Sequence, residues 1–419
     1  MILLSGNAIV GQSGGPTAAI NATLSGVIRG VMSQMKKHGC IHKLYGMRNG
    51  IAGLLEDKTV CLSDLFDREE KLKLLEQTPA AILGSCRKKL PDPDSPSPED
   101  MAVYQRLFDV LDAYDIRYFF YIGGNDSMDT VAKMSRYSEK HNKGIRVIGI
   151  PKTIDNDLAH TDHTPGYGSA AKFIATVMRE IVCDCSVYTN RAVTIVEIMG
   201  RDAGWLTAAA ALGRMSDGVS PDLIYLPERS FDTERFLARL EELFALRPNL
   251  VVAVSEGIRF ADGRYVGESA QNGVTDVFGH QYLAGTAKVL EAAVRERFGC
   301  KVRSIELSLP QRCASHMLSL TDITESIRIG QAAIQAALDG VSGEVMLFER
   351  QSTTPYQCTI RHQSAQAIAN QIQYVPSEFI TESGDQVTDA CCEYLLPLIE
   401  GECDVLYQKG MPRVLVLPN

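Results

Sequence analysis

The strongest constraint on this chain is the run Pro-Lys-Thr-Ile-Asp-Asn-Asp at 151–157, together with Gly-Gly-Asn-Asp-Ser at 123–127. Each run follows a short apolar segment, 145–150 and 116–122, whose β-branched and aromatic content predicts a buried strand. A helical apolar pattern over 128–142 joins the two strands. This βαβ unit brings both runs to the carboxyl edge of a parallel sheet, where such sheets bind ligands. Acids, an amide, a lysine and hydroxyls then meet in one crevice suited to a polyphosphate, its metal ion and an acceptor hydroxyl.

Other parts of the chain repeat this arrangement. Gly11, Arg201 and Glu256 also stand where an apolar run ends, which favours a doubly wound α/β fold with one active crevice. The glycine turn at 13–16 opens a helical pattern, and its backbone N–H groups can approach an anion. A Gly-Gly turn is equally often only a tight connection. Its spacing matches neither G-x-G-x-x-G nor a Walker A loop, which disfavours a standard dinucleotide fold and a P-loop enzyme.

The composition limits the classes of function. A length of 419 residues predicts two or three domains, and a formal net charge of -9 argues against non-specific binding to nucleic acid or an anionic membrane. No apolar run approaches the ~20 residues that span a bilayer. Residues 1–10 are expected to form the first strand and not a signal peptide. Eleven cysteines without paired metal-ligand spacing indicate reduced thiols in a cytoplasmic compartment.

Three local features carry narrower expectations. His160 and His163 lack a third ligand at suitable spacing, so we interpret them as solvated loop residues and not as a metal site. The three cations at 87–89 are typical of a solvated face, from which only Arg87 is expected to point inward. Residues 413–418 are expected to close the chain as an edge strand.

The order of the motifs adds a resemblance. The chain carries, in sequence, S-G-G-P (13–16), L-G-S-C-R (83–87), G-G-N-D-S (123–127), P-K-T-I-D-N-D (151–157), M-G-R (199–201), S-E-G (255–257) and Q-R-C (311–313). This series resembles the 6-phosphofructokinase family from about residue 8 to residue 320. Asp126 and Lys152 resemble its pyrophosphate-dependent branch, because ATP-using members usually have glycine at both positions. A carboxylate there fills space and repels a nucleotide, and a lysine brings a cation to the short diphosphate. The alternative is a surface ion pair between these two residues, worth little.

The resemblance implies Mg²⁺-dependent, reversible phosphoryl transfer from pyrophosphate to the C1 hydroxyl of fructose 6-phosphate, with Asp155 as the general base. The implied catalytic residues are Asp155, Lys152 and Arg201. The implied donor-binding residues are Gly14, Gly15, Arg87, Asp126, Ser127 and Lys152. The residues implied for the sugar phosphate are Thr153, Asp155, Arg191, Met199, Gly200, Arg201, Glu256, Arg303 and Arg312. Those implied for Mg²⁺ are Asp126, Asp157 and Asn125.

The resemblance also implies an organisation. Two lobes of doubly wound, mostly parallel sheet hold the active site in the cleft between them. The donor lobe takes 1–165 and about 311–370, and the sugar-phosphate lobe takes 166–310 and about 371–419. The equivalents of Arg191 and Arg303 reach in from a neighbouring subunit in relatives, which implies a homo-oligomer, dimer or tetramer, with shared active sites.

Three positions depart from the family pattern. Asn125 replaces a metal-associated Asp, Leu309 lies near the position of a sugar-phosphate histidine, and Cys313 follows Arg312 where glycine is usual. Three alternatives stay open. An ATP-dependent enzyme would act on the same sugar. A non-catalytic, sugar-phosphate-sensing subunit and a G-G-D-G kinase acting on lipid or NAD are both disfavoured by the intact P-K-T-I-D-N-D run.

Overall fold

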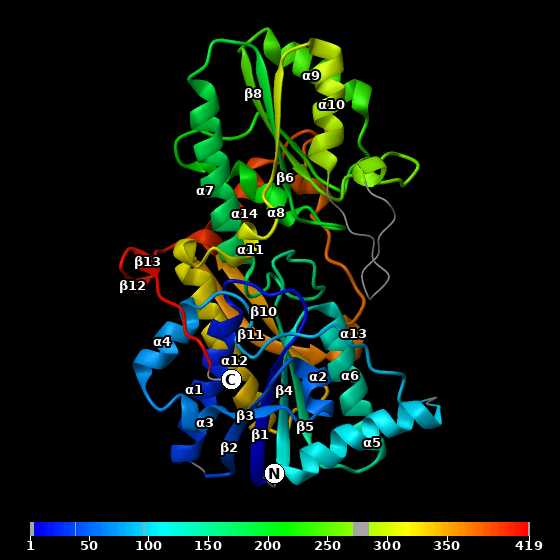
Figure 1. Cartoon of the computed structure of the whole chain (residues 1–419), viewed down its shortest axis with the longest axis vertical. Helices are drawn as coiled ribbons and strands as arrows, with labels where there is room; N and C mark the ends of the chain where they lie inside the picture. Colours follow the sequence, from blue (N-terminus) through cyan, green and yellow to red (C-terminus); the bar gives the residue numbers. More distant parts are fainter. Residues whose placement is uncertain (1–3, 38, 95–96, 271–284, 418–419) are drawn as a thin grey trace.

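The computed structural model describes residues 4–37, 39–94, 97–270 and 285–417. Figure 1 shows two α/β lobes stacked along the long axis, a larger one below and a smaller one above. Each lobe contains one main sheet covered by helices on both faces. The predicted fold class is confirmed. The exact division of the chain between the lobes stays a prediction.

The larger lobe is built on a seven-stranded mixed sheet. Its order is β11-β10-β5-β4-β1-β2-β3, with parallel pairing from β10 to β2 and antiparallel pairing at both edges. The chain leaves β1 to one side for β2 and returns on the other side to β4, so the topological switch lies between β1 and β4. The strand bounds are β1 (Gly6–Gln12), β2 (Ile41–Met47), β3 (Thr59–Cys61), β4 (Ile116–Gly123), β5 (Arg146–Pro151), β10 (Glu344–Thr353) and β11 (Tyr356–Ser364).

The smaller lobe is built on a four-stranded parallel sheet, in the order β7-β8-β6-β9. Strand β6 is buried along almost its whole length, as its continuous apolar run predicts. The strand bounds are β6 (Ala192–Ile198), β7 (Leu223–Tyr225), β8 (Asn249–Ser255) and β9 (Lys301–Glu306). The carboxyl ends of β6 and β8 face the larger lobe, where they border the interlobe cleft.

Helices cover both sheets. Those of the larger lobe are α1 (Ile20–Lys37), α2 (Gly50–Leu55), α3 (Leu62–Leu65), α4 (Glu69–Gln77), α5 (Pro98–Ala113), α6 (Asn125–Lys140), α12 (Leu320–Leu338) and α13 (Ala365–Ile368). Those of the smaller lobe and the junction are α7 (Tyr167–Ser186), α8 (Trp205–Ala208), α9 (Thr233–Phe244), α10 (Thr286–Phe298), α11 (Pro310–Cys313) and α14 (Asp389–Leu395). Helix α8 is short, since 3₁₀ geometry begins at Ala209.

The predicted edge strand at 413–418 is wrong for the residues that the structure describes. A short hairpin of two-residue strands, β12 (Tyr407–Gln408) and β13 (Met411–Pro412), ends before residue 413. The backbone that follows is hydrogen-bonded by the side chains of Gln77, the last residue of α4, and of Thr78 just after it. Gln77 donates to the carbonyl of Arg413 at 2.8 Å, and the N–H of Leu415 donates to Thr78 at 2.9 Å. These bonds satisfy the polar backbone without a neighbouring strand.

Helices α1 and α12 pack so closely that glycine is required at their crossing. A Cβ on Gly26 would lie 2.1 Å from the carbonyl oxygen of Ile327. We therefore expect Gly26→Ala to lower the free energy of unfolding by about 1–3 kcal/mol, because overpacking outweighs the gain in helix propensity. Urea denaturation measures this change. Ser33→Ala, at an exposed position of the same helix, should change the free energy of unfolding by less than ~0.5 kcal/mol. An equal loss of stability in the two variants would contradict the close crossing of α1 and α12.

Candidate active site

The strand ends of both lobes meet in one interlobe cleft with a volume of about 470 Å³. The larger lobe contributes the turns after β1, β4 and β5, and the smaller lobe contributes the turns after β6 and β8. The predicted site residues that line it are Gly14, Gly15, Arg87, Asn125, Asp126, Ser127, Lys152, Thr153, Asp155, Asp157, Met199, Arg201, Glu256 and Arg312. Segments far apart in the chain therefore converge as the strand-end pattern predicts.

The glycine turn after β1 forms one wall of the cleft. Gly14 has a φ of 75°, a left-handed conformation that glycine adopts without strain. The turn is fixed from outside, because Gly14 donates its N–H to Cys86 at 3.3 Å and accepts a 2.6 Å bond from Ser85. A Cβ on Gly14 would lie 3.5 Å from Lys152 Nζ. Glycine thus leaves the space beside this ammonium group open for a ligand.

Lys152 is the buried cation of the cleft. It directly follows β5, is 2% exposed and donates from Nζ to the carbonyl of Gly15. Burial lowers the pKa of Lys152 to about 8, although Asp155 and Asp157 favour its charged form. The alternative ion pair with Asp126 is not formed between these two described residues. A buried ammonium of this kind is arranged to meet an anion in the cleft.

Asp126 contacts a different cation. Its Oδ1 lies 3.3 Å from Lys89 Nζ, and the two side chains are 40% and 51% exposed. Such an exposed pair contributes little to stability. It spans the rim of the cleft, however, joining α6 to the loop that carries Arg87. Lys88 and Lys89 are exposed, as the run of cations predicts, but both also border the cleft, which the sequence did not indicate. No spacing signal marks Lys89, because its partner lies in another segment.

The acids of the cleft stand on a sharply bent loop. Asn156, between Asp155 and Asp157, has a φ of 54° in the left-handed region, which asparagine tolerates better than most residues. Burial, opposed in part by Arg201 and Lys152, raises the pKa of Asp155. Burial and then the neighbouring Asp155 raise the pKa of Asp157. Two carboxylates so close and so buried need a cation or a proton donor between them.

The smaller lobe contributes the opposite wall. Gly200 donates its N–H to Glu256 Oε1 at 3.3 Å, and Met199 donates to Gln311 at 3.1 Å. Burial, followed by the charge of Asp155, raises the pKa of Glu256 to about 8. Arg312 is partly buried, and this burial lowers the pKa of its guanidinium. The wall therefore presents arginines and a proton-holding carboxyl, which suit a sugar phosphate.

The oxygen donors of the donor side fit a divalent cation. Asn125 has a buried side-chain oxygen without a hydrogen-bond partner, and it borders the cleft with Asp126 and Asp157. Mg²⁺ keeps several waters and takes one or two protein oxygens together with substrate phosphates. A full protein cage is not expected, and within the described residues no cluster of three or more His, Cys, Asp or Glu forms one.

Three predicted residues do not line the cleft. Gly200 lies just behind it. Arg191 stacks over the ring of Phe244 at 4.5 Å and directly precedes the amino end of β6, an interior strand of the small sheet. Arg303 lies within β9. The tail also contributes residues that the sequence did not indicate. Asn370 and Ile372 border the cleft, and they carry no motif.

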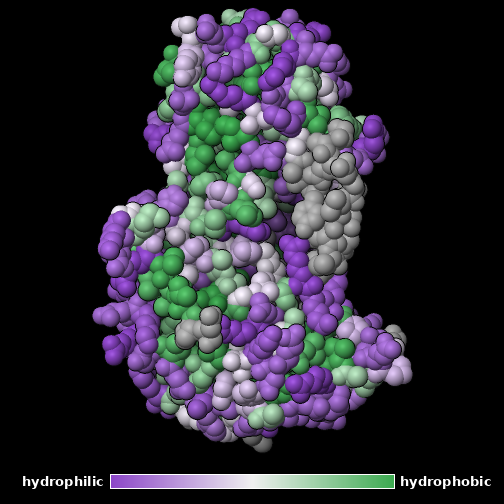
Figure 2. Space-filling view, in the orientation of Figure 1, coloured by the Kyte–Doolittle hydropathy of each residue, from purple (hydrophilic) through white to green (hydrophobic). Residues whose placement is uncertain are grey.

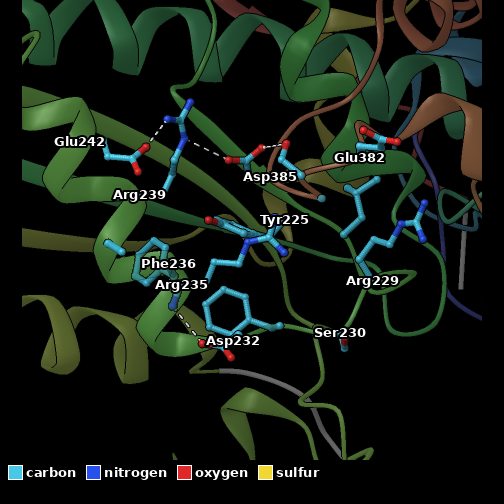
Figure 3. A pocket seen from close by; sticks show the side chains of 15 residues that line it. Tyr225, Arg229, Ser230, Asp232, Arg235, Phe236, Arg239, Glu242, Glu382 and Asp385 are labelled. Atoms are coloured by element: carbon cyan, nitrogen blue, oxygen red, sulfur yellow. Dashed lines mark hydrogen bonds and ion pairs between the residues drawn. The ribbon is translucent and has the colours of Figure 1, made fainter.

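A second hollow, of about 820 Å³, lies in the smaller lobe around α9 and 382–385 (Figure 3). None of the predicted site residues lines it. Arg239 bridges Glu242 at 2.6 Å and Asp385 at 3.2 Å there, so much of its charge is already compensated. The chemistry of this hollow matches no motif of the chain.

The fold and the cleft define an α/β enzyme with an anion-binding active site between two lobes. Residues 7–337 match the family model described as phosphofructokinase, and the chain belongs to this family. A relative from Halomonas elongata named pyrophosphate--fructose 6-phosphate 1-phosphotransferase is 39% identical over 410 residues, covering 97% of this chain and 95% of its own. A relative of the same name from Methylococcus capsulatus is 40% identical, over 99% and 96% of the two chains.

A solved structure agrees with these relatives. The pyrophosphate-dependent phosphofructokinase of Nitrosospira multiformis superposes with a TM-score of 0.85 at 36% identity, covering 99% of this chain and 98% of its own. The family predicted from the sequence is confirmed. Among the helices that the structure describes, none combines the length and apolar character needed to cross a bilayer.

Proposed function

We propose that the chain transfers a phosphoryl group reversibly from pyrophosphate to the C1 hydroxyl of fructose 6-phosphate, giving fructose 1,6-bisphosphate and phosphate. The main support for this proposal is the arrangement of side chains at the donor end of the cleft. Lys152 is buried against the glycine turn, and the Asp126–Lys89 pair occupies the rim. A compact inorganic donor fits such a site better than a nucleotide. The names and full-length similarity of the relatives support the same reaction.

Asp155 is proposed as the general base. It takes the proton of the C1 hydroxyl while the hydroxyl oxygen attacks the terminal phosphorus and the bond to the leaving phosphate breaks. The burial that raises its pKa also makes its carboxylate a stronger base. Lys152, Thr153 and the glycine turn hold the transferred phosphoryl group, whose charge they offset. Arg201, Glu256 and Arg312 hold the sugar phosphate from the smaller lobe.

The proposed cofactor is Mg²⁺, which neutralises charge on the diphosphate oxygens when bound. Asp157, Asp126 and the unpartnered oxygen of Asn125 are the residues proposed to hold it. An ATP-dependent reaction is the alternative, and the occupied rim disfavours it. A non-catalytic regulatory subunit is disfavoured because Asp155, Asp157 and Lys152 converge in the cleft.

A homo-oligomer with shared active sites is also proposed. Arg191 lies outside the cleft of its own chain, beside apolar side chains that remain exposed, namely Val187 at 71%, Tyr188 at 51% and Leu246 at 79%. Figure 2 shows that apolar residues gather in separate patches on both lobes of one face, among hydrophilic ones. A second copy seated on Val187, Tyr188 and Leu246 would cover these exposed side chains. A cytoplasmic location is proposed because all eleven cysteines are free thiols.

A donor panel tests this function. Purified protein with fructose 6-phosphate and Mg²⁺ should form the bisphosphate with pyrophosphate at a kcat/KM at least ~100-fold above that with ATP or ADP. Chelation of the metal should abolish turnover, and Mg²⁺ should restore it. A preference for ATP, or no turnover with any donor, would contradict the proposal.

A further inference from the structure

The loop that carries the cleft acids is supported by its own return arm. After Asp157 the chain turns back, and residues 161–166 lie against 153–156. Thr164 donates its hydroxyl to the carbonyl of Thr153 at 2.8 Å and to the side-chain oxygen of Asn156 at 3.4 Å. Thr153 in turn donates its N–H to the carbonyl of Pro165 at 3.3 Å. The position of Asp155 is thus set by whatever holds the return arm.

His163, in the middle of this arm, is not a solvated loop residue. It is 3% exposed, so the interpretation made from the sequence is wrong for it, whereas His160 is exposed as expected. Its Nδ1 lies 2.8 Å from Asp162 Oδ2 and its Nε2 lies 2.7 Å from Glu325 Oε2. A neutral imidazole has one donor nitrogen only, so two carboxylate partners require the doubly protonated ring. The ring also stacks on Phe348 at 4.5 Å.

The two carboxylates are themselves held by other elements. Arg350 on β10 donates to Asp162 at 3.1 Å, and the hydroxyl of Tyr394 on α14 donates to it at 3.0 Å. Tyr356 on β11 donates to Glu325 at 3.0 Å. Burial opposes the charge on the ring, but the hydrogen bonds to both carboxylates raise the pKa of His163 to about 9. The two buried cations, His163 and Arg350, are therefore paired with two buried carboxylates, Asp162 and Glu325. Such pairing offsets the free-energy cost of burying charge.

Helix α12 holds the same arm at a second point. Asp322 accepts the N–H of Gly166 at 2.8 Å and that of Ser169 at 2.9 Å. The arm thus contacts α12 through both Glu325 and Asp322. The charged and titratable groups around His163 are Asp162 on its own loop, Asp322 and Glu325 on α12, Arg350 on β10, Tyr356 and Cys358 on β11, and Tyr394 on α14.

We infer that His163 is a positioning residue for phosphoryl transfer, clamping the return arm to α12 so that Thr164 holds Thr153 and Asp155 in line. His163 does not line the cleft, so it acts through the loop and not on substrate. This inference rests on the proposed function. A core histidine that only stabilised the fold would affect the folded fraction, and not the turnover of folded protein.

His163→Gln tests the clamp in the full-length enzyme. The amide keeps one hydrogen bond but cannot carry the charge. We expect kcat to fall about 10- to 100-fold, because small misplacements of a reacting group cost this much, with the KM for fructose 6-phosphate within ~3-fold. His160→Gln is the matched control on the same loop, and its kcat should match wild type. Wild-type kcat in His163→Gln, measured well below its melting temperature, would overturn the inference.

Glu325→Gln gives a second, milder test should His163→Gln not fold. It removes one of the two charges that hold the imidazolium, so the pKa of His163, followed by imidazole NMR, should fall and kcat should fall ~3- to 10-fold. A wild-type His163 that titrates near its ordinary value, or a variant with unchanged kcat, would overturn the clamp. Wild-type turnover is measured first with each donor. If the wild-type enzyme shows no turnover with any donor, the proposed function is wrong. If it shows turnover, the kcat values of the two variants test the clamp alone.

Discussion

Replacing Asp155 with asparagine should lower kcat about 10³-fold while the KM for fructose 6-phosphate changes little. A general base contributes on the order of 10²- to 10⁴-fold, and the amide keeps the shape of the side chain but cannot accept the hydroxyl proton. Arg201, Glu256 and Arg312, which are proposed to hold the sugar phosphate, remain in place. Steady-state kinetics with pyrophosphate and Mg²⁺, at saturating sugar phosphate, measures this loss.

Asp202→Asn is the matched control for this change. Asp202 also lines the cleft, but its side chain is paired with Arg259. Its charge acts on Asp155 only from a distance. We expect less than about a 10-fold loss of kcat, from electrostatics alone. If Asp155→Asn and Asp202→Asn lost activity equally, the base would have to lie elsewhere in the cleft.

The strand-end pattern explains why so much of this cleft could be predicted. Each motif directly follows a buried strand, and parallel strands end at one edge, so local periodicity was enough to bring the motifs at 13–16, 123–127 and 151–157 together. The order of motifs then identified the family. The roles assigned to the site residues stay predictions, because they follow from the resemblance to the family and not from the hydrophobic periodicity.

Features that depend on distant partners could not be predicted. His163 is buried because Glu325, 162 residues further along the chain, accepts a hydrogen bond from its second ring N–H. Lys89 borders the cleft because Asp126 on another element attracts it. The segment after 412 is not a strand because Gln77 binds its backbone. In each case the outcome depends on contacts with distant residues, and a single sequence carries no signal for them.

Asp126→Gly should shift the donor preference of the enzyme toward ATP. Two effects act in the same direction. The glycine vacates space at the rim of the cleft, and the substitution removes a carboxylate that would repel a nucleotide phosphate there. Removing one like charge near a phosphate is worth about 2–3 kcal/mol at an effective dielectric constant near 20. We therefore expect the ratio of kcat/KM for ATP to that for pyrophosphate to rise about 30- to 100-fold.

A matched control separates the rim from general charge effects. Asp129 lies on the same helix but does not line the cleft, and it pairs with Lys133 at 2.7 Å instead of a cleft residue. Asp129→Ala removes an equal charge and should leave the donor ratio within ~3-fold. Lys152 stays buried in both variants, and Asp157 and Asn125 remain to hold Mg²⁺, so turnover with pyrophosphate should persist. A donor ratio in Asp126→Gly equal to that of Asp129→Ala would mean that the rim pair does not select the donor, and selectivity would then rest on Lys152 alone.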